Sequence, residues 1–206
     1  MIIFSNQQPP LFKRLILIAF TTAFVCTLTK GSTAQDDLLA QEERALQQAV
    51  AQVAASVVQI EVLGGLETDN DGPVSGLAVS TDGYILSSAV NFPPSFTSIL
   101  ASTPSGKRAA TTLVSRDYNR NLVLLKVNTT EQYTTASPVP HAEVIVGQWA
   151  VALGKTYSRE VVNQSLGIVS ATNRIWGKAL QTDAKISPAN YGGPLIDIQG
   201  RVYGIL

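Results

Sequence analysis

The first regular pattern in the chain has the period of a helix. Between residues 36 and 55, apolar positions recur at spacings of three, four and seven: Leu39, Leu46, Val50 and Val53. Polar residues separate them, and Asp36 and Asp37 suit the first turn of a helix. The pattern predicts an amphipathic N-terminal helix over residues 35–56, either packed on the rest of the domain or used in oligomerisation.

After Ser56 the pattern changes to the period of two that is typical of strands. Val57–Val62 alternates apolar and polar residues for most of its length. Asp82-Gly83 separates the apolar runs Leu77–Ser80 and Tyr84–Leu86, which predicts a hairpin. Further strands are expected at residues 98–102, 109–114, 122–127, 149–153, 164–170, 179–182 and 201–206. Many short strands divided by Gly, Pro and Asn favour an all-β antiparallel sandwich or pair of barrels.

The first 34 residues have the pattern of an export signal. Lys13 and Arg14 precede the apolar run Leu15–Leu28, and Ala34 is a suitable cleavage position before Gln35. The run has 14 residues, whereas a helix needs about 20 to span a bilayer. A cleaved signal is therefore preferred to a retained anchor, and it places the mature chain in the periplasm or outside the cell.

Composition removes several classes of function. The mature chain carries 12 basic and 15 acidic residues, without a basic stripe, so nucleic acid is not an expected partner. Cys26 is the only cysteine and His141 the only histidine, a poor supply of metal ligands, and no cofactor is expected. The segment Asp69–Gly72 is similar to the start of a calcium loop but lacks the later glutamate, so it is interpreted as a turn.

Seven segments, in a fixed order, resemble one known family. They are Val57–Ile60, Ser75–Val79, Asp82–Leu86, Asp117–Lys126, Val146–Gly154, Gly167–Ala171 and Gln181–Ala184. From about residue 55 to 206 the chain resembles the HtrA (Deg) family of exported, trypsin-like serine proteases. The resemblance implies a trypsin-like double antiparallel β-barrel, with a first barrel over 57–136, a linker at Ser137–Pro140 and a partial second barrel over 141–206.

The same resemblance places the catalytic triad on three unsuitable residues. A serine attacks, a histidine moves its proton and an aspartate orients the histidine. Here the histidine position is occupied by Val90, the aspartate position by Asn121 and the serine position by Tyr191. Valine cannot move a proton, an amide carries no charge, and a phenol is a poor nucleophile without a base. The resemblance therefore implies a degenerate site.

The loop around the missing serine keeps part of its family pattern. Its oxyanion segment comprises Ala189, Asn190, Gly192 and Gly193. The family has glycine at position 189, and alanine resists a positive φ, which puts the oxyanion hole in doubt. Gly192 and Gly193 are interpreted as backbone requirements of the loop.

Other residues of catalytic type are weak substitutes. His141 follows the linker and is expected to be an ordinary exposed histidine. Asp117 is expected to cap the turn before the next strand. Lys185 and Ser187 could form a dyad by residue type, but nothing in their spacing requires a shared site.

The sequence favours an exported, catalytically inactive relative of the HtrA proteases that binds a polypeptide or a partner subunit. Trimers are common in the resembled family, so a homo-oligomer is a further expectation, and after signal cleavage no membrane contact is expected. Two alternatives stay open. One is an active serine endopeptidase; the other is a truncated, non-functional product, because the family has further strands where this chain stops at Leu206.

Overall fold

The structure is a computed structural model of the 206-residue chain and describes residues 35–64 and 72–206. The expected signal over residues 1–34 lies outside the described residues, as do Asp69, Asn70 and Asp71 of the calcium-like motif. The chain divides into two compact units, up to Arg44 and from Ala45 onward. The described part of the first unit is helical throughout, and its Leu38 and Leu39 are exposed.

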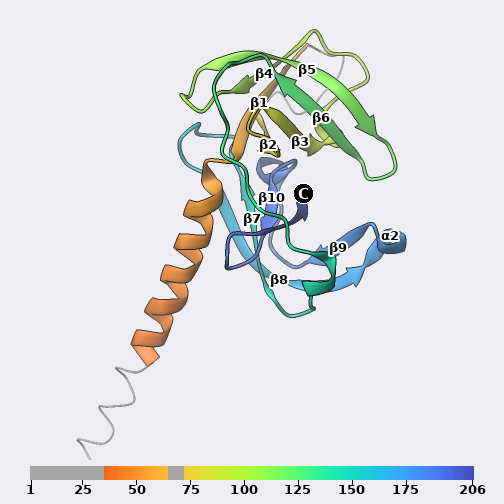
Figure 1. Cartoon of the computed structure of the whole chain (residues 1–206). Coiled ribbons are helices and arrows are strands. Elements are labelled where there is room, and N and C mark those ends of the chain that lie inside the picture. Colours follow the sequence, from red (N-terminus) through yellow and green to blue (C-terminus); the bar gives the residue numbers. More distant parts are fainter. Residues whose placement is uncertain (1–34, 65–71) are drawn as a thin grey trace, which may run out of the picture. The chain divides into compact units, whose positions relative to one another are not determined.

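Six antiparallel strands close into a barrel at the start of the second unit (Figure 1). They are β1 (Val57–Leu63), β2 (Val74–Ala78), β3 (Tyr84–Ser88), β4 (Ser98–Ser102), β5 (Arg108–Asp117) and β6 (Leu122–Val127), in the spatial order β1-β2-β3-β6-β5-β4. Ile60, Ile85 and Leu125 are fully buried inside it. The alternation in the sequence places such residues on the inner face, because successive side chains of a strand point to opposite sides.

Two details of the first barrel bear on the sequence predictions. The Asp82-Gly83 hairpin is present, with Leu77 paired to Leu86 and Gly83 at φ +91°. The prediction of a strand over Leu77–Ser80 was wrong in its bounds, because β2 begins at Val74 and ends at Ala78. All five residues of β2 are buried, so Ser75 and Gly76 belong to the strand despite their weak apolar character.

Five strands form a second, open sheet (Figure 1). They are β7 (Trp149–Gly154), β8 (Asn163–Asn173), β9 (Ala179–Thr182), β10 (Pro194–Ile196) and β11 (Val202–Ile205), in the order β11-β10-β7-β8-β9. Ala150, Ala152, Val169 and Leu195 form its buried centre. The sequence pattern did not predict β10, a three-residue strand that starts with a proline directly after two glycines.

Residues 45–54 continue in helical conformation and pack on both sheets. Ala49 and Val53 are buried in one cluster with β-strand residues that include Leu77 and Val151. Of the apolar face that the helical period predicts, Leu46, Val50 and Val53 pack in this cluster, whereas Leu39 is exposed. Packing on the domain is thus observed for this part of the helix, whereas its use in oligomerisation stays a prediction.

Short segments join these elements. The turns η1 (Ala89–Asn91), η2 (His141–Glu143) and η3 (Pro188–Asn190) are 3-10 helices. The short segment α2 (Arg174–Gly177) between β8 and β9 is a turn in which Ile175 and Trp176 have left-handed backbone angles. The expected linker pairs with β11, because the N–H of Val139 donates to the carbonyl of Val202 and the N–H of Val202 donates to that of Ser137, both at 2.8 Å. No helix within the described part of the chain is long and apolar enough to cross a membrane.

The predicted fold is confirmed. The chain is mostly β, with one N-terminal helix, one closed barrel and a second sheet that curls into a half-barrel.

Candidate active site

Val90 lies in η1, directly after the buried end of β3. Its side chain is 60% exposed, whereas the preceding Ala89 is buried. The N–H of Ala89 donates to the carbonyl oxygen of Asn121 at 2.8 Å. This hydrogen bond follows from the pairing of β3 with β6, in which Ser88 lies opposite Leu122. The sheet register therefore holds the first two expected triad positions side by side.

Asn121 has a left-handed backbone, with φ +57°, immediately before β6. Asparagine tolerates this conformation better than most residues other than glycine. The turn before it is capped by Asp117, whose Oδ1 accepts hydrogen bonds from the N–H groups of Asn119 (2.8 Å) and Arg120 (3.0 Å). These bonds and the Arg120 guanidinium lower the pKa of the Asp117 carboxyl group. Asp117 therefore serves the turn and is engaged within it.

Tyr191 follows η3 and is half-buried. The turn is closed by Asn190, which is 4% exposed and whose Oδ1 accepts both the N–H and the hydroxyl of Ser187 at 3.3 and 3.2 Å. Pro188 occupies the first position of the turn, where its fixed φ suits a helical start. Since the Ser187 hydroxyl bonds to an amide oxygen, a dyad with Lys185 receives no support from this geometry.

Asn91 joins the two sheets at the candidate site. Its Nδ2 donates to the carbonyl oxygen of Tyr191 at 3.0 Å, and the N–H of Ser75 donates to the same oxygen at 3.3 Å. Asn91 is the residue directly after Val90, so these bonds bring Tyr191 to the segment that carries Val90. The structure thus brings together the segments that carry Val90, Asn121 and Tyr191, through the hydrogen bonds from Ala89 to Asn121 and from the Asn91 side chain to Tyr191. Sequence reasoning missed Asn91, which lies outside the matched segments, and Ser75, whose only signal was its position within one of them.

Gly192 and Gly193 lie close to the backbone of neighbouring strands. Gly192 has φ +84°, and a Cβ there would lie 2.2 Å from both the carbonyl oxygen of Ser75 and the hydroxyl of Ser87. A Cβ on Gly193 would lie 2.0 Å from the carbonyl oxygen of Leu153. These distances exclude a larger side chain without movement of the backbone, so both glycines are required by the path of the loop.

The backbone donors of this loop point into the protein. Each N–H donates to a backbone carbonyl oxygen: that of Tyr191 to Pro188 at 3.3 Å, that of Gly192 to Leu206 at 2.8 Å, and that of Gly193 to Asn190 at 2.9 Å. In trypsin-like proteases the oxyanion hole uses the N–H of the nucleophile and that of the residue two positions before it. At the corresponding Tyr191, the donor is already engaged in a local turn.

The backbone of Ala189 does not have the positive φ that alanine was expected to resist. Within residues 35–64 and 72–206, the non-glycine residues with positive φ are Asn121, Asn173, Ile175 and Trp176. Ala189 lies instead in the 3-10 turn of η3, and its carbonyl oxygen accepts the Ser75 hydroxyl at 3.2 Å. The Ser187–Asn190 hydrogen bonds favour this turn, which an alanine adopts without strain.

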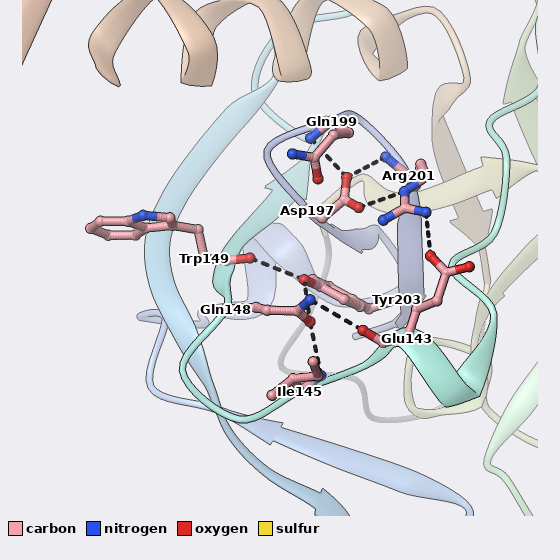
Figure 2. Close-up of polar contacts among 8 residues, drawn as sticks. All are labelled: Glu143, Ile145, Gln148, Trp149, Asp197, Gln199, Arg201 and Tyr203. Carbon is pink, nitrogen blue, oxygen red and sulfur yellow. Dashed lines mark hydrogen bonds and ion pairs between the residues drawn. The ribbon is translucent and has the colours of Figure 1, made fainter. Parts of the chain in front are cut away.

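The β10–β11 hairpin that follows the loop is fixed by a polar network (Figure 2). Asp197 is buried, and its carboxylate accepts the N–H groups of Gln199 and Arg201 at 2.9 and 2.8 Å and the Arg201 Nε at 2.7 Å. Arg201 also donates to Glu143 at 2.7 Å, and the Tyr203 hydroxyl contacts the Gln148 side chain at 3.1 Å. The network anchors β11 to the chain before β7 and so supports β10.

The described residues offer little support for catalysis by the histidine or by a metal ion. His141 is exposed in η2. Among the described residues, no three His, Cys, Asp or Glu side chains are grouped closely enough to hold a metal ion.

Comparison with known proteins identifies the family of this chain. Residues 74–205 match the family described as "Trypsin-like peptidase domain". The chain is 34% identical over 136 residues to a probable periplasmic serine endoprotease DegP-like of Halomonas elongata, covering 64% of this chain and 28% of that protein. It is 28% identical over 155 residues to a protein of the same description from Chlamydia pneumoniae, covering 68% of this chain and 31% of that one.

A third relative carries the family's other common name. The chain is 32% identical over 112 residues to the serine protease Do-like HtrA of Lactococcus lactis subsp. cremoris, covering 48% of this chain and 28% of that protein. The chain spans less than a third of the length of each of these relatives.

Proposed function

Because the chain belongs to the trypsin-like peptidase domain family, among the HtrA (DegP) proteins, we propose that it is an exported, catalytically inactive relative that binds polypeptide. One observation carries the proposal. The resemblance expects histidine, aspartate and serine at Val90, Asn121 and Tyr191. The segments that carry these three residues are joined by hydrogen bonds from Ala89 to Asn121 at 2.8 Å and from Asn91 to Tyr191 at 3.0 Å. The scaffold of the site is kept while its reactive groups are absent.

The physical argument concerns the proton. Acyl transfer needs a base that takes the proton of the nucleophile and returns it to the leaving group. The cluster offers an aliphatic side chain at position 90 and a neutral amide at position 121, and neither can act as that base. Loss of the triad costs a serine protease about a million-fold in kcat, with a residual rate from the oxyanion hole and binding. Here the N–H of Tyr191 is also engaged with Pro188, which weakens that residual contribution.

Polypeptide is the favoured ligand because the relatives are named endoproteases and this chain keeps their barrel frame. The name "periplasmic" on the Halomonas and Chlamydia proteins supports export, together with the apolar segment Leu15–Leu28. Tyr191 is bulkier than serine and half-exposed, so it would stand in the space of a scissile bond and favour binding without cleavage.

The test combines cleavage and binding of one substrate. Purified protein is incubated with fluorescein-labelled casein, and both peptide release and fluorescence anisotropy are followed. We expect saturable binding and no release above the rate without protein. Casein cleavage that a serine-protease inhibitor abolishes would overturn the inactive assignment and establish the active endopeptidase. The absence of binding would overturn the polypeptide-binding part.

A restored variant provides the matched control. Val90→His, Asn121→Asp and Tyr191→Ser are combined in one protein, with each single variant alongside. Release of peptide by the triple variant, and by none of the single variants, is the expected result if the frame of the site is intact and only its chemistry is lost, because triad members act as a unit.

A further inference from the structure

A polar pocket lies between the first barrel and the segment that follows β7, and Tyr191 is not part of its lining. Its volume is about 120 Å³. Six of the residues that line it are Val57, Ser102, Thr103, Tyr133, Lys155 and Arg159. The pocket therefore combines two cationic side chains with several hydroxyl groups.

Lys155 is held firmly in this pocket. Its N–H donates to the Ser75 hydroxyl at 2.7 Å, and its Nζ donates to the carbonyl oxygen of Val57 at 3.2 Å. Over residues 35–64 and 72–206, no carboxylate lies within 4.0 Å of its ammonium group. Burial lowers the pKa of Lys155, because the charged form loses hydration without gaining a counter-charge. An ammonium has three donors, and one carbonyl oxygen satisfies one of them.

Arg159 and its neighbours leave the pocket positive. Arg159 donates from Nε to the Gln59 side chain at 3.1 Å and lies 3.5 Å from Glu61. Glu61 is shared, because Arg108 also contacts it at 3.2 Å. Beside the pocket, Glu61 is thus shared between Arg159, which lines the pocket, and Arg108, which does not. Lys155 is the second positive charge of the lining.

The opposite wall is pre-formed. The Tyr133 hydroxyl donates to the carbonyl oxygen of Ser102 at 2.9 Å, and the Ser102 hydroxyl accepts the N–H of Gln59 at 3.1 Å. The nearby Glu131 is turned to the Ser105 N–H at 2.8 Å and to the Thr103 hydroxyl at 3.1 Å. Because its oxygens already accept these donors, Glu131 is not turned toward Lys155.

We propose that this pocket binds a small oxyanion, a carboxylate or phosphate group, with Lys155 as its principal contact. The bound oxygen atoms would supply the acceptors that the Lys155 ammonium lacks. Their negative charge would balance the excess of positive charge from Lys155 and Arg159. A volume of about 120 Å³ has room for such a group. This site is separate from Tyr191, and the inference does not rest on the proposed function.

The test is a titration of the full isotope-labelled chain with inorganic phosphate and, separately, with sodium acetate, at constant ionic strength. Backbone amide shifts and the Lys155 side-chain Cε–Hε signals are followed by NMR. We expect saturable shifts concentrated at Val57, Thr103, Lys155 and Arg159. Tighter binding of acetate assigns the site to a carboxylate, and tighter binding of phosphate assigns it to a phosphate group. Shifts that rise linearly and spread over exposed lysines and arginines would overturn the proposal.

Matched variants separate this site from general charge effects. Lys155→Gln should weaken binding about tenfold to a hundredfold, the range of a hydrogen bond to a charged group. Lys155→Arg keeps the charge and should retain most of the affinity. Lys185→Gln removes an exposed lysine outside the pocket and should leave the affinity unchanged. Equal weakening by Lys155→Gln and Lys185→Gln would contradict the proposal. If Lys155→Gln does not fold, the Lys155 side-chain signals of the unchanged protein decide the outcome.

Discussion

The side-chain amide of Asn91 donates a hydrogen bond to the backbone carbonyl oxygen of Tyr191, with 3.0 Å between Nδ2 and O. The two residues are 100 positions apart, Asn91 in η1 and Tyr191 directly after η3. Asn91 is 9% exposed, so water does not readily replace this bond. The Asn91 side chain in η1 thereby helps to fix the position of the loop that carries Tyr191.

Replacing Asn91 should loosen that loop. Asn91→Ala should lower the free energy of unfolding by about 1–2 kcal/mol, the usual range for loss of a buried hydrogen bond. The carbonyl oxygen of Tyr191 keeps its bond from the Ser75 N–H at 3.3 Å, which limits the loss. The measurement is guanidinium unfolding, with Asn128→Ala at an exposed position as control. Equal stabilities for the two variants would contradict the role given to Asn91.

The sequence predicted the elements whose patterns are local. The N-terminal helix has a clear 3.6-residue period, and the β2–β3 hairpin has Asp-Gly at its turn, so both could be located before the structure was known. The strand β10 could not, because three buried residues after two glycines are too few to show a period. Its existence depends on pairing with β11, the next strand along the chain, and with β7, which is distant in sequence.

The site was predictable in part for a similar reason. Positions 90, 121 and 191 were found through family motifs, whereas the contact that joins them depends on the Asn91 side chain, which no motif marks. The sequence indicated that Ala189 resists the positive φ that the family's glycine allows, but not which conformation it adopts. The Ser187–Asn190 hydrogen bonds, which form only once the loop is folded, favour a 3-10 turn at that position instead.

Gly192 provides a second prediction. Its φ of +84° and the 2.2 Å distance of a Cβ from the Ser75 carbonyl oxygen mean that Gly192→Ala meets both conformational and steric penalties. We expect a loss of about 2–5 kcal/mol in the free energy of unfolding. Gly106→Ala is the matched control, because Gly106 has φ +80° but no atom within 4 Å of a Cβ. That variant should lose only about 1–2 kcal/mol, and equal losses in the two variants would show that the close approach is absent.

Substitution of Asn121 tests whether the residue at this position is required for its left-handed backbone conformation. With φ +57°, Asn121→Gly should be neutral or slightly stabilising, whereas Asn121→Val should cost about 1–3 kcal/mol. Asn121→Asp should be close to neutral, because aspartate also tolerates this conformation. Thermal unfolding of the three variants provides the comparison. A valine variant as stable as the glycine variant would mean that the left-handed turn is not maintained in solution.

Tyr133 makes stability depend on alkaline pH. Burial raises the pKa of its hydroxyl to about 12, from an ordinary value of 10.0, and Glu131 contributes in the same direction. The folded state therefore keeps a proton that the unfolded state loses above pH 10. This contribution to stability is complete below pH 10 and is lost as the pH rises toward 12. Guanidinium midpoints at pH 9, 10 and 11 should fall across this range.

The variant Tyr133→Phe isolates the contribution of this hydroxyl. It removes the ionisable group together with the hydrogen bond to Ser102, so it should be less stable at pH 9 and should lose less stability between pH 10 and 11 than the unchanged protein. Tyr157→Phe, at a fully exposed tyrosine, should leave both the stability and its pH dependence as they are. Tyr203 has a raised pKa as well, because of burial, so some alkaline dependence will remain in the Tyr133→Phe protein. A decline of the same steepness with and without the Tyr133 hydroxyl would assign the alkaline loss to other groups.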